Sequence, residues 1–347
     1  MNSPETLIAE FERFVRRDPG GRGLIGPDAD CGIGVGELLH AARELADRAT
    51  RVCLVTGFFI PILNPSSPDV TPDAPAGFAE TDGPLGTILL ARVLRDLGAE
   101  VLVVTDINCE CVLRRAALFA GLSDHHIAAA PLQSNAWRAD FWSSEFGRSL
   151  SHLIAIERVG PSHTRESLAA SGASPESLLA FENSVPVPER GHCFNMRGLP
   201  IDQFTGDVHR LFDELADQAP TAVSLSVGDG GNEIGMGRFD WSLLSQRLGG
   251  PVGAKIPCRI ATQRSILAGT SNWGAYALAA AVAVLKGRVD VLEQHTAQAQ
   301  HDMLAAIVND ARAVDGVTRR HEVTVDGLPF LTYIQPWIGI RRLLNLD

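Results

Sequence analysis

The chain has 347 residues and a formal net charge of −11, with 45% hydrophobic and 20% charged residues. At roughly 150 residues per domain, this length predicts two domains or one large α/β unit, and the apolar content excludes a wholly disordered chain. The acidic balance and the absence of a basic run argue against a nucleic-acid partner. Schiff-base chemistry has two candidate anchors, because Lys255 and Lys286 are the two lysines of the chain.

The sequence also indicates where in the cell the protein is expected. No stretch of roughly 18 uncharged apolar residues predicts a membrane-spanning helix, and the amphipathic N-terminal segment lacks the apolar centre of a secretory signal. The six cysteines are scattered and match neither a disulfide framework nor a zinc site. We therefore expect a cytoplasmic protein with no membrane partner, and a homo-oligomer is compatible with the sequence.

The period of the apolar residues alternates between helix-like and strand-like segments along the chain. Helices are predicted at 3–16, 34–48, 84–97, 108–120, 134–148, 162–171, 207–217, 273–286 and 289–313, and strands at 51–57, 100–106, 126–130, 152–156, 221–227 and 258–261. This order predicts a doubly wound, mainly parallel α/β sheet with helices on both faces.

Four segments depart from this alternation. They are a Gly-rich link at 18–36, a Pro-rich loop at 58–82, an irregular insertion at 158–204 and a C-terminal hairpin at 321–330 that turns at Asp326-Gly327. We divide the chain into an N-terminal helical segment (1–50), an α/β catalytic domain (51–290) and a C-terminal helix and hairpin packed on it (291–347).

Polar residues cluster where the predicted strands end, and ligands of open α/β sheets bind at that edge. Asp82 precedes the helix that starts at Pro84, so it either caps that helix or belongs to an anion site at the helix start. Asp106 ends the next strand, where a carboxylate holds a metal, a ribose hydroxyl or an ammonium group, or caps a helix. Arg158 and Arg197 lie in predicted loops, where the planar guanidinium group of each can bind a carboxylate with two hydrogen bonds. Surface ion pairing is the alternative.

The strongest signal is the glycine loop 228–237, which has five glycines in ten residues directly after an apolar strand. Such a loop can bring backbone N–H groups close to a ligand. Asp229, Asn232 and Glu233 add two carboxylates and an amide, which a purely structural turn does not need. The loop is neither a Walker loop nor a clean dinucleotide fingerprint. Further on, Ser271-Asn272-Trp273 opens the most apolar helix, either as a plain cap or as an oxyanion site.

Together these segments resemble the D-glutamate cyclase family. The resembling stretches are Gly57-Phe-Phe-Ile-Pro61, Glu80-Thr-Asp-Gly-Pro84, Thr105-Asp106, Ile156-Glu-Arg158, Phe194-Asn-Met-Arg-Gly198, the glycine loop 228–237 and Ser271-Asn-Trp-Gly-Ala-Tyr-Ala-Leu278. Members convert D-glutamate to 5-oxo-D-proline with loss of water, so the resemblance implies a hydro-lyase with an α/β fold. Two departures stand out: the long insertion after Glu157-Arg158, and Gln263, where the family tends to carry an acidic residue. Both bear on which amino acid is the substrate.

Ring closure needs a deprotonated amine, an electrophilic γ-carboxyl group and a way to expel water. The catalytic candidates are Asp82, Glu157, Asp229, Asn232 and Glu233. The substrate-binding candidates are Arg158, Asn195, Arg197, Gly230, Gly231, Ser271, Asn272 and Trp273. Arg197 or Arg158 is expected to hold the α-carboxylate, and amides at 230–232 or 271–274 to stabilise the oxyanion.

The need for a metal stays open. Asp82, Asp106 and Asp229 form a candidate site for Mg²⁺ or Mn²⁺, because these ions prefer oxygen ligands, but a proton-only mechanism fits equally. Three alternatives to the cyclase also remain. They are a related enzyme acting on another small acid, a nucleotide- or phosphate-binding enzyme, and an amino-acid-binding sensor without turnover.

Overall fold

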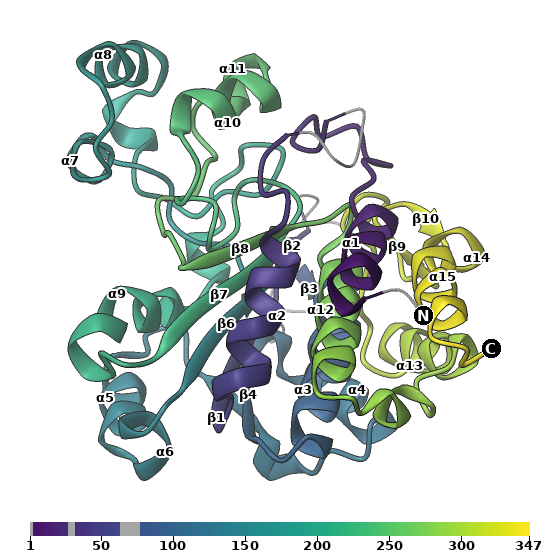
Figure 1. Ribbon diagram of the computed structural model, residues 1–347. Helices are drawn as coiled ribbons and strands as arrows, with labels where there is room; N and C mark the ends of the chain where they lie inside the picture. Colours follow the sequence, from purple (N-terminus) through teal and green to yellow (C-terminus); the bar gives the residue numbers. More distant parts are fainter. Residues whose placement is uncertain (1–2, 27–31, 63–76) are drawn as a thin grey trace.

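The structure is a computed structural model that describes residues 3–26, 32–62 and 77–347. Its centre is a parallel sheet of six strands in the order β5-β4-β1-β6-β7-β8 (Figure 1). The strands are β5 (Ile127–Ala130), β4 (Glu100–Asp106), β1 (Arg51–Thr56), β6 (His152–Ile156), β7 (Val223–Gly228) and β8 (Arg264–Leu267). The predicted doubly wound α/β fold is confirmed.

Alternating side chains of the strands build two apolar layers. In β1, Val52 and Leu54 join the main core, whereas Cys53 and Val55 belong to a second cluster on the opposite face. The main core is covered by α1 (Pro4–Val15), α2 (Glu37–Arg48), α3 (Pro84–Asp96), α4 (Glu110–Phe119), α12 (Ser271–Leu285), α13 (Ala297–Asn309) and α15 (Gln335–Leu343). The second cluster is covered by α5 (Asn135–Ser143), α6 (Glu145–Arg148) and α9 (Arg210–Gln218). Burial on both faces explains why the strands read as unbroken apolar runs.

A small lobe stands at one corner of the molecule, above the sheet in Figure 1. It consists of α7 (Arg165–Ala170), α8 (Pro175–Ser184), α10 (Trp241–Leu248) and α11 (Gly250–Gly253). Phe181 and Trp241 meet edge to face in its own apolar cluster, with ring centroids 5.3 Å apart. The predicted insertion therefore holds two helices instead of one. The sequence carried a signal for the second, since Ser174 caps α8 and Pro175 occupies its first turn.

Three predicted elements lie elsewhere or are broken. The helix predicted at 134–148 breaks into α5 and α6, because Ser144 is extended and caps α6. The strand predicted at 258–261 is wrong: those residues form isolated bridges, and Arg264–Leu267 pairs with β7 instead. Cys258 and Ile260 look strand-like because they pack in a side cluster beside the sheet. The helix predicted at 289–313 is split, because Thr296 caps a new helix and accepts a hydrogen bond from the amide of Ala299.

The remaining elements are short. They are β2 (Phe59–Pro61) with β3 (Gly77–Ala79), the predicted hairpin of β9 (Thr324–Val325) and β10 (Leu328–Pro329), α14 (Phe330–Tyr333), and 3₁₀ turns at Ile107–Cys109, Asp124–His126, Val187–Glu189, Asp202–Phe204, Asp207–His209 and Val289–Leu292. Parts of the predicted link 18–36 and loop 58–82, namely 27–31 and 63–76, lie outside the described residues. Within the described ranges, no helix is both long and apolar enough to cross a membrane.

Candidate functional site

A cavity of about 260 Å³ lies beyond the carboxyl ends of β6 and β7. Six of the predicted site residues line it: Glu157, Asn195, Arg197, Asp229, Asn232 and Glu233. The C-terminal segment closes it with Asp326, at the turn of the β9–β10 hairpin, and the N-terminal segment contributes Arg22. Pockets for drug-sized ligands start at roughly 300 Å³, so this cavity is matched to a small metabolite.

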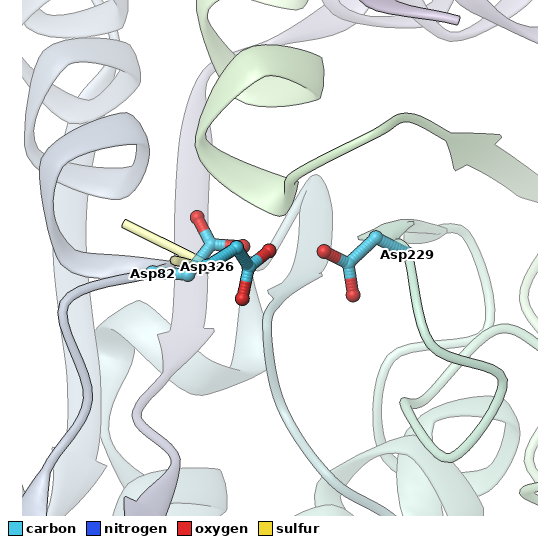
Figure 2. Close-up of side chains that lie close together, drawn as sticks. All are labelled: Asp82, Asp229 and Asp326. Atoms are coloured by element: carbon cyan, nitrogen blue, oxygen red, sulfur yellow. The ribbon is translucent and has the colours of Figure 1, made fainter. Parts of the chain in front are cut away.

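Buried carboxylates gather at this cavity: Glu157, Asp229, Glu233 and Asp326 line it, and Asp82 lies directly behind Asp229 and Asp326 without lining it. One oxygen each of Asp82, Asp229 and Asp326 lie within 4.8 Å of one another, and the same holds for Glu157, Asp229 and Glu233. Figure 2 shows Asp82 and Asp326 side by side, with the carboxylate of Asp229 facing them. All five side chains are buried. We call this set, together with the buried Glu80, the acidic floor.

Asp82 does not cap the helix that it precedes. Its two carboxylate oxygens accept the backbone N–H groups of Ser271 and Asn272, at 2.7 and 2.9 Å, at the start of α12. In return, Oδ1 of Asn272 accepts the amides of Gly83 and Gly86 at the start of α3, at 3.0 and 2.7 Å. The two helix starts are thus joined by a reciprocal cap, which satisfies buried N–H groups and fixes Asp82 in the floor.

Glu233 organises the glycine loop from within. Its carboxylate accepts the amides of Gly230 and Gly231, both at 2.7 Å. The loop needs glycine at 231, where φ is +96°, and at 230, where a Cβ would lie 2.8 Å from both Glu233 Oε1 and Met196 Sδ. Of the predicted amides at 230–232, those of Gly230 and Gly231 are therefore already donated to a side chain of the same loop.

Glu157 adopts an unusual backbone conformation directly after β6. Its φ of +45° falls in the left-handed region, which costs energy for a residue with a Cβ and tends to occur at functional sites. The Oγ of Ser271 donates to its carboxylate at 2.6 Å. This contact is what brings Ser271 to the site.

Crowding of buried carboxylates shifts their proton affinities. Burial, with the charge of Asp326 as the next cause, raises the pKa of Asp82 to about 7. Burial followed by Glu233 and Asp82 raises the pKa of Glu157 well above its ordinary value, and burial also raises the pKa of Asp229 and of Glu80. Groups that hold protons near neutral pH can act as acid or base.

Arg22 and Asp326 belong to this site and were not predicted for it. Arg22 pairs with Asp229, and its Nη2 lies 3.1 Å from Asp326 Oδ1. Burial alone would lower the pKa of Arg22, but Asp229, Asp326 and Glu157 together raise it. Arg22 sits in a Gly-rich link with no periodic pattern, so nothing in the sequence singled it out. The sequence did identify Asp326, but only as a turn residue of the predicted hairpin.

Asp106 and Arg158 lie apart from the acidic floor. Arg158 is fully buried and binds Asp106 with both Nη atoms, at 2.6 and 3.1 Å, as well as the carbonyl oxygens of Gly57 and Gly206. The predicted metal set of Asp82, Asp106 and Asp229 is not brought together, because Asp106 is engaged in this pair and Asp326 takes its place beside the other two. Arg158 likewise does not line the cavity as a substrate-binding residue.

The start of α12 does not face the cavity with free amides. The N–H groups of Ser271 and Asn272 go to Asp82, that of Trp273 goes to Oγ1 of Thr270, and that of Gly274 goes to the carbonyl oxygen of Thr270. The indole of Trp273 is buried in the core and donates to the carbonyl of Tyr333. The predicted oxyanion role of 271–274 therefore has no donor to rest on, and Trp273 packs as a core residue.

The two departures from the family pattern differ in position. Asn195 and Arg197 line the cavity, but they belong to the stretch 194–198 that resembles the family, and no described residue between Arg158 and Asn195 lines it. Gln263 does not line the cavity: it pairs with Ser224, near the amino-terminal end of β7, accepting the Ser224 amide at 2.8 Å. The residue type at position 263 therefore does not affect the composition of the cavity.

The sequence is similar to known proteins. Residues 11–180 and 166–335 match the family described as "D-glutamate cyclase-like, C-terminal". The human protein named "D-glutamate cyclase, mitochondrial" is 27% identical over 363 aligned positions, which cover 94% of this chain and 50% of the human protein. The chain thus spans about half the length of that relative. The matched segments cover most of the chain and contain every residue of the acidic floor, and the chain belongs to the D-glutamate cyclase-like, C-terminal family.

Proposed function

We propose that this protein is a hydro-lyase that closes D-glutamate, or a closely related amino acid, to 5-oxo-D-proline or the related lactam with loss of water. The observation that carries the proposal is a set of buried carboxylates with raised pKa values around a cavity of metabolite size. Family membership and the name of the human relative support the same chemistry. A cytoplasmic location stays a prediction, and the human relative is by its name a mitochondrial protein.

The proposed reaction balances without an external acid, base or oxidant. The amine nitrogen forms a bond to the γ-carboxyl carbon, and one oxygen of that carboxyl group leaves as water. Two protons of the ammonium group end on the departing oxygen, so the net charge does not change. The protein must therefore accept protons on one side of the substrate and donate them on the other.

Three side chains of the acidic floor suit this transfer. Glu157 and Asp82 have raised pKa values, so each can hold a proton near neutral pH and return it. Asp229 lies between their two carboxylate clusters and links them. In the proposal, an ionised carboxylate takes a proton from the ammonium group and a protonated neighbour donates one to the leaving oxygen. Glu233 holds the glycine loop in place through its amides instead of transferring protons.

The same floor suits a divalent metal ion. Asp82, Asp229 and Asp326 present oxygen ligands close together, and Oδ2 of the buried Asp326 has no hydrogen-bond partner in the described part of the chain. Hard oxygen ligands of this kind suit Mg²⁺ or Mn²⁺. An ion bound there would polarise the γ-carboxyl group. Arg22 neutralises part of the same charge, so we propose that it shares the site.

The test is incubation of the purified protein with D- and L-glutamate and their homologues, with and without EDTA, followed by mass spectrometry for the loss of one water. We expect a dehydrated product from D-glutamate. Loss of water from a different acid would assign another substrate, and EDTA sensitivity would establish the metal. Binding without any product would leave the amino-acid sensor. Asp229→Asn is the matched inactive control, because it removes one charge and keeps the shape.

A further inference from the structure

Besides Arg22, the described residues that line the cavity include two arginines. Arg197 comes from the insertion and Arg319 from the loop between α13 and β9. They are far apart in the sequence, but Nη2 of Arg197 donates to the carbonyl of Val317, 3.2 Å away, which ties the two loops together at the cavity. We call these two residues the arginine pair.

Both loops hold the arginine pair in defined backbone positions. Oδ1 of Asn195 accepts the amides of Arg197 and Leu199, at 3.0 and 3.1 Å. In the other loop, the amide of Arg319 donates to the carbonyl of Asp315 at 2.7 Å, and the side chain of Asp315 accepts two further loop amides. The pair is therefore pre-positioned, which lowers the entropy lost on binding.

The arginine pair lacks the acidic partners that the other cavity arginine has. Arg22 is paired with two carboxylates, whereas neither Arg197 nor Arg319 forms an ion pair with any described residue. Nε of Arg319 is buried and finds no acceptor among residues 3–26, 32–62 and 77–347. Burial, with the charge of Arg197 as the second cause, lowers the pKa of Arg319. Arg197 is exposed and Arg319 is partly buried, so both guanidinium groups can be reached by a ligand, and a carboxylate is the anion that their geometry fits.

Arg319 also occupies a strained position. Its φ of +59° lies in the left-handed region, where glycine or asparagine is the cheaper choice. A long cationic side chain at such a position is consistent with a role for the guanidinium group itself.

The charges of the cavity define one orientation of a zwitterionic substrate. In the proposed cyclisation, the ammonium and the γ-carboxyl group react, and the α-carboxylate stays unchanged. An α-carboxylate placed against the acidic floor would be repelled, so it must face the free cations. We propose that Arg197 and Arg319 together bind the non-reacting α-carboxylate, and that Arg319 makes the site selective for amino acids that carry it. This inference rests on the proposed function.

The test compares two ligands that differ in that one group. Affinities for D-glutamate and for its α-amide are measured by isothermal titration calorimetry, for the unaltered protein and for Arg319→Gln. A hydrogen-bonded charge contributes about 1.5–3 kcal/mol, so the preference for D-glutamate over the amide should fall roughly 10- to 100-fold in the variant. Arg319→Lys should restore part of the preference, because it keeps the charge. Arg320→Gln is the matched control: the neighbouring arginine is exposed, pairs with Glu322 and should leave the preference unchanged.

Turnover separates this inference from the proposed function. With the product assay, Arg319→Gln should raise the KM for D-glutamate more than it lowers kcat. If the unaltered protein binds D-glutamate but forms no product, the proposed function fails, and the inference stands only if the preference is still lost in Arg319→Gln. If product forms but the preference survives in Arg319→Gln, or falls equally in Arg320→Gln, the inference is overturned. Failure of the unaltered protein to bind any amino diacid overturns both.

Discussion

Two groups of buried charges lie at the same edge of the sheet and differ in balance. Beyond β4 and β6, Asp106 and Arg158 neutralise each other, and two carbonyl oxygens complete the guanidinium's contacts. Beyond β6 and β7, the acidic floor gathers carboxylates around a single paired arginine, Arg22. The first group has no charge left for a ligand, and the second has a large excess. The Asp106–Arg158 pair and the acidic floor therefore have similar residue types at similar strand ends. They differ in charge balance, which is the feature that marks the floor as a candidate catalytic site.

Neutralising one acid of the floor should affect activity most. For Glu157→Gln we expect kcat to fall roughly 10²- to 10⁴-fold, the usual contribution of a general acid or base. Thermal unfolding followed by circular dichroism should show no loss of stability, because burial and neighbouring acids make the charged form of Glu157 unfavourable in the folded state. Turnover within tenfold of the unaltered protein would remove Glu157 from the proposed proton transfer.

Removing one partner of the Asp106–Arg158 pair should lower stability and leave substrate binding unchanged. Asp106→Asn leaves Arg158 buried without a counter-charge, which costs about 3–5 kcal/mol of folding free energy. Denaturant unfolding measures the loss, and the folded fraction should keep its KM, since neither side chain lines the cavity. Asp310→Asn is the control: it breaks an exposed pair with Arg115 and should cost at most about 1 kcal/mol. Equal effects of the two substitutions would contradict the distinction.

The sequence predicted the sheet more fully than the site. Apolar runs and helix periodicity depend on local pattern, so every strand of the sheet except β8 was located. The glycine loop and Asp82 were also identified, because strand-end loops of such composition are unusual. Arg22 and Asp326 were missed because they reach the floor from the two ends of the chain, and only the packing of those ends on the sheet brings them there. Whether Asp106 or Asp326 joined Asp82 was likewise decided by tertiary contacts.

The excess charge of the floor should make stability depend on pH. The raised pKa of Asp82, about 7, means that the folded state binds more protons than the unfolded state between about pH 4 and 7. Stability should therefore fall as pH rises through that window, by up to about 1.4 kcal/mol per pH unit for this one group. Urea unfolding at several pH values measures the slope, and Asp82→Asn should make it shallower, with the raised pKa values of Glu157, Asp229 and Glu80 accounting for the rest. A slope that persists unchanged in the variant would assign the dependence to other groups.

Breaking the reciprocal cap should have the smallest effect of these changes. The cap connects Asp82 of the acidic floor with the starts of α3 and α12. Asn272→Ala removes the acceptor of two buried amides at the start of α3, which should cost about 1–3 kcal/mol. Thr296→Ala, which removes a partly exposed cap of α13, should cost only about 1 kcal/mol. Because the amide of residue 272 still holds Asp82, the backbone half of the cap survives in the variant. We therefore expect Asn272→Ala to unfold at a lower urea concentration and to lose less kcat than Glu157→Gln. If Asn272→Ala instead keeps full stability and loses as much kcat as Glu157→Gln, Asn272 itself takes part in the reaction.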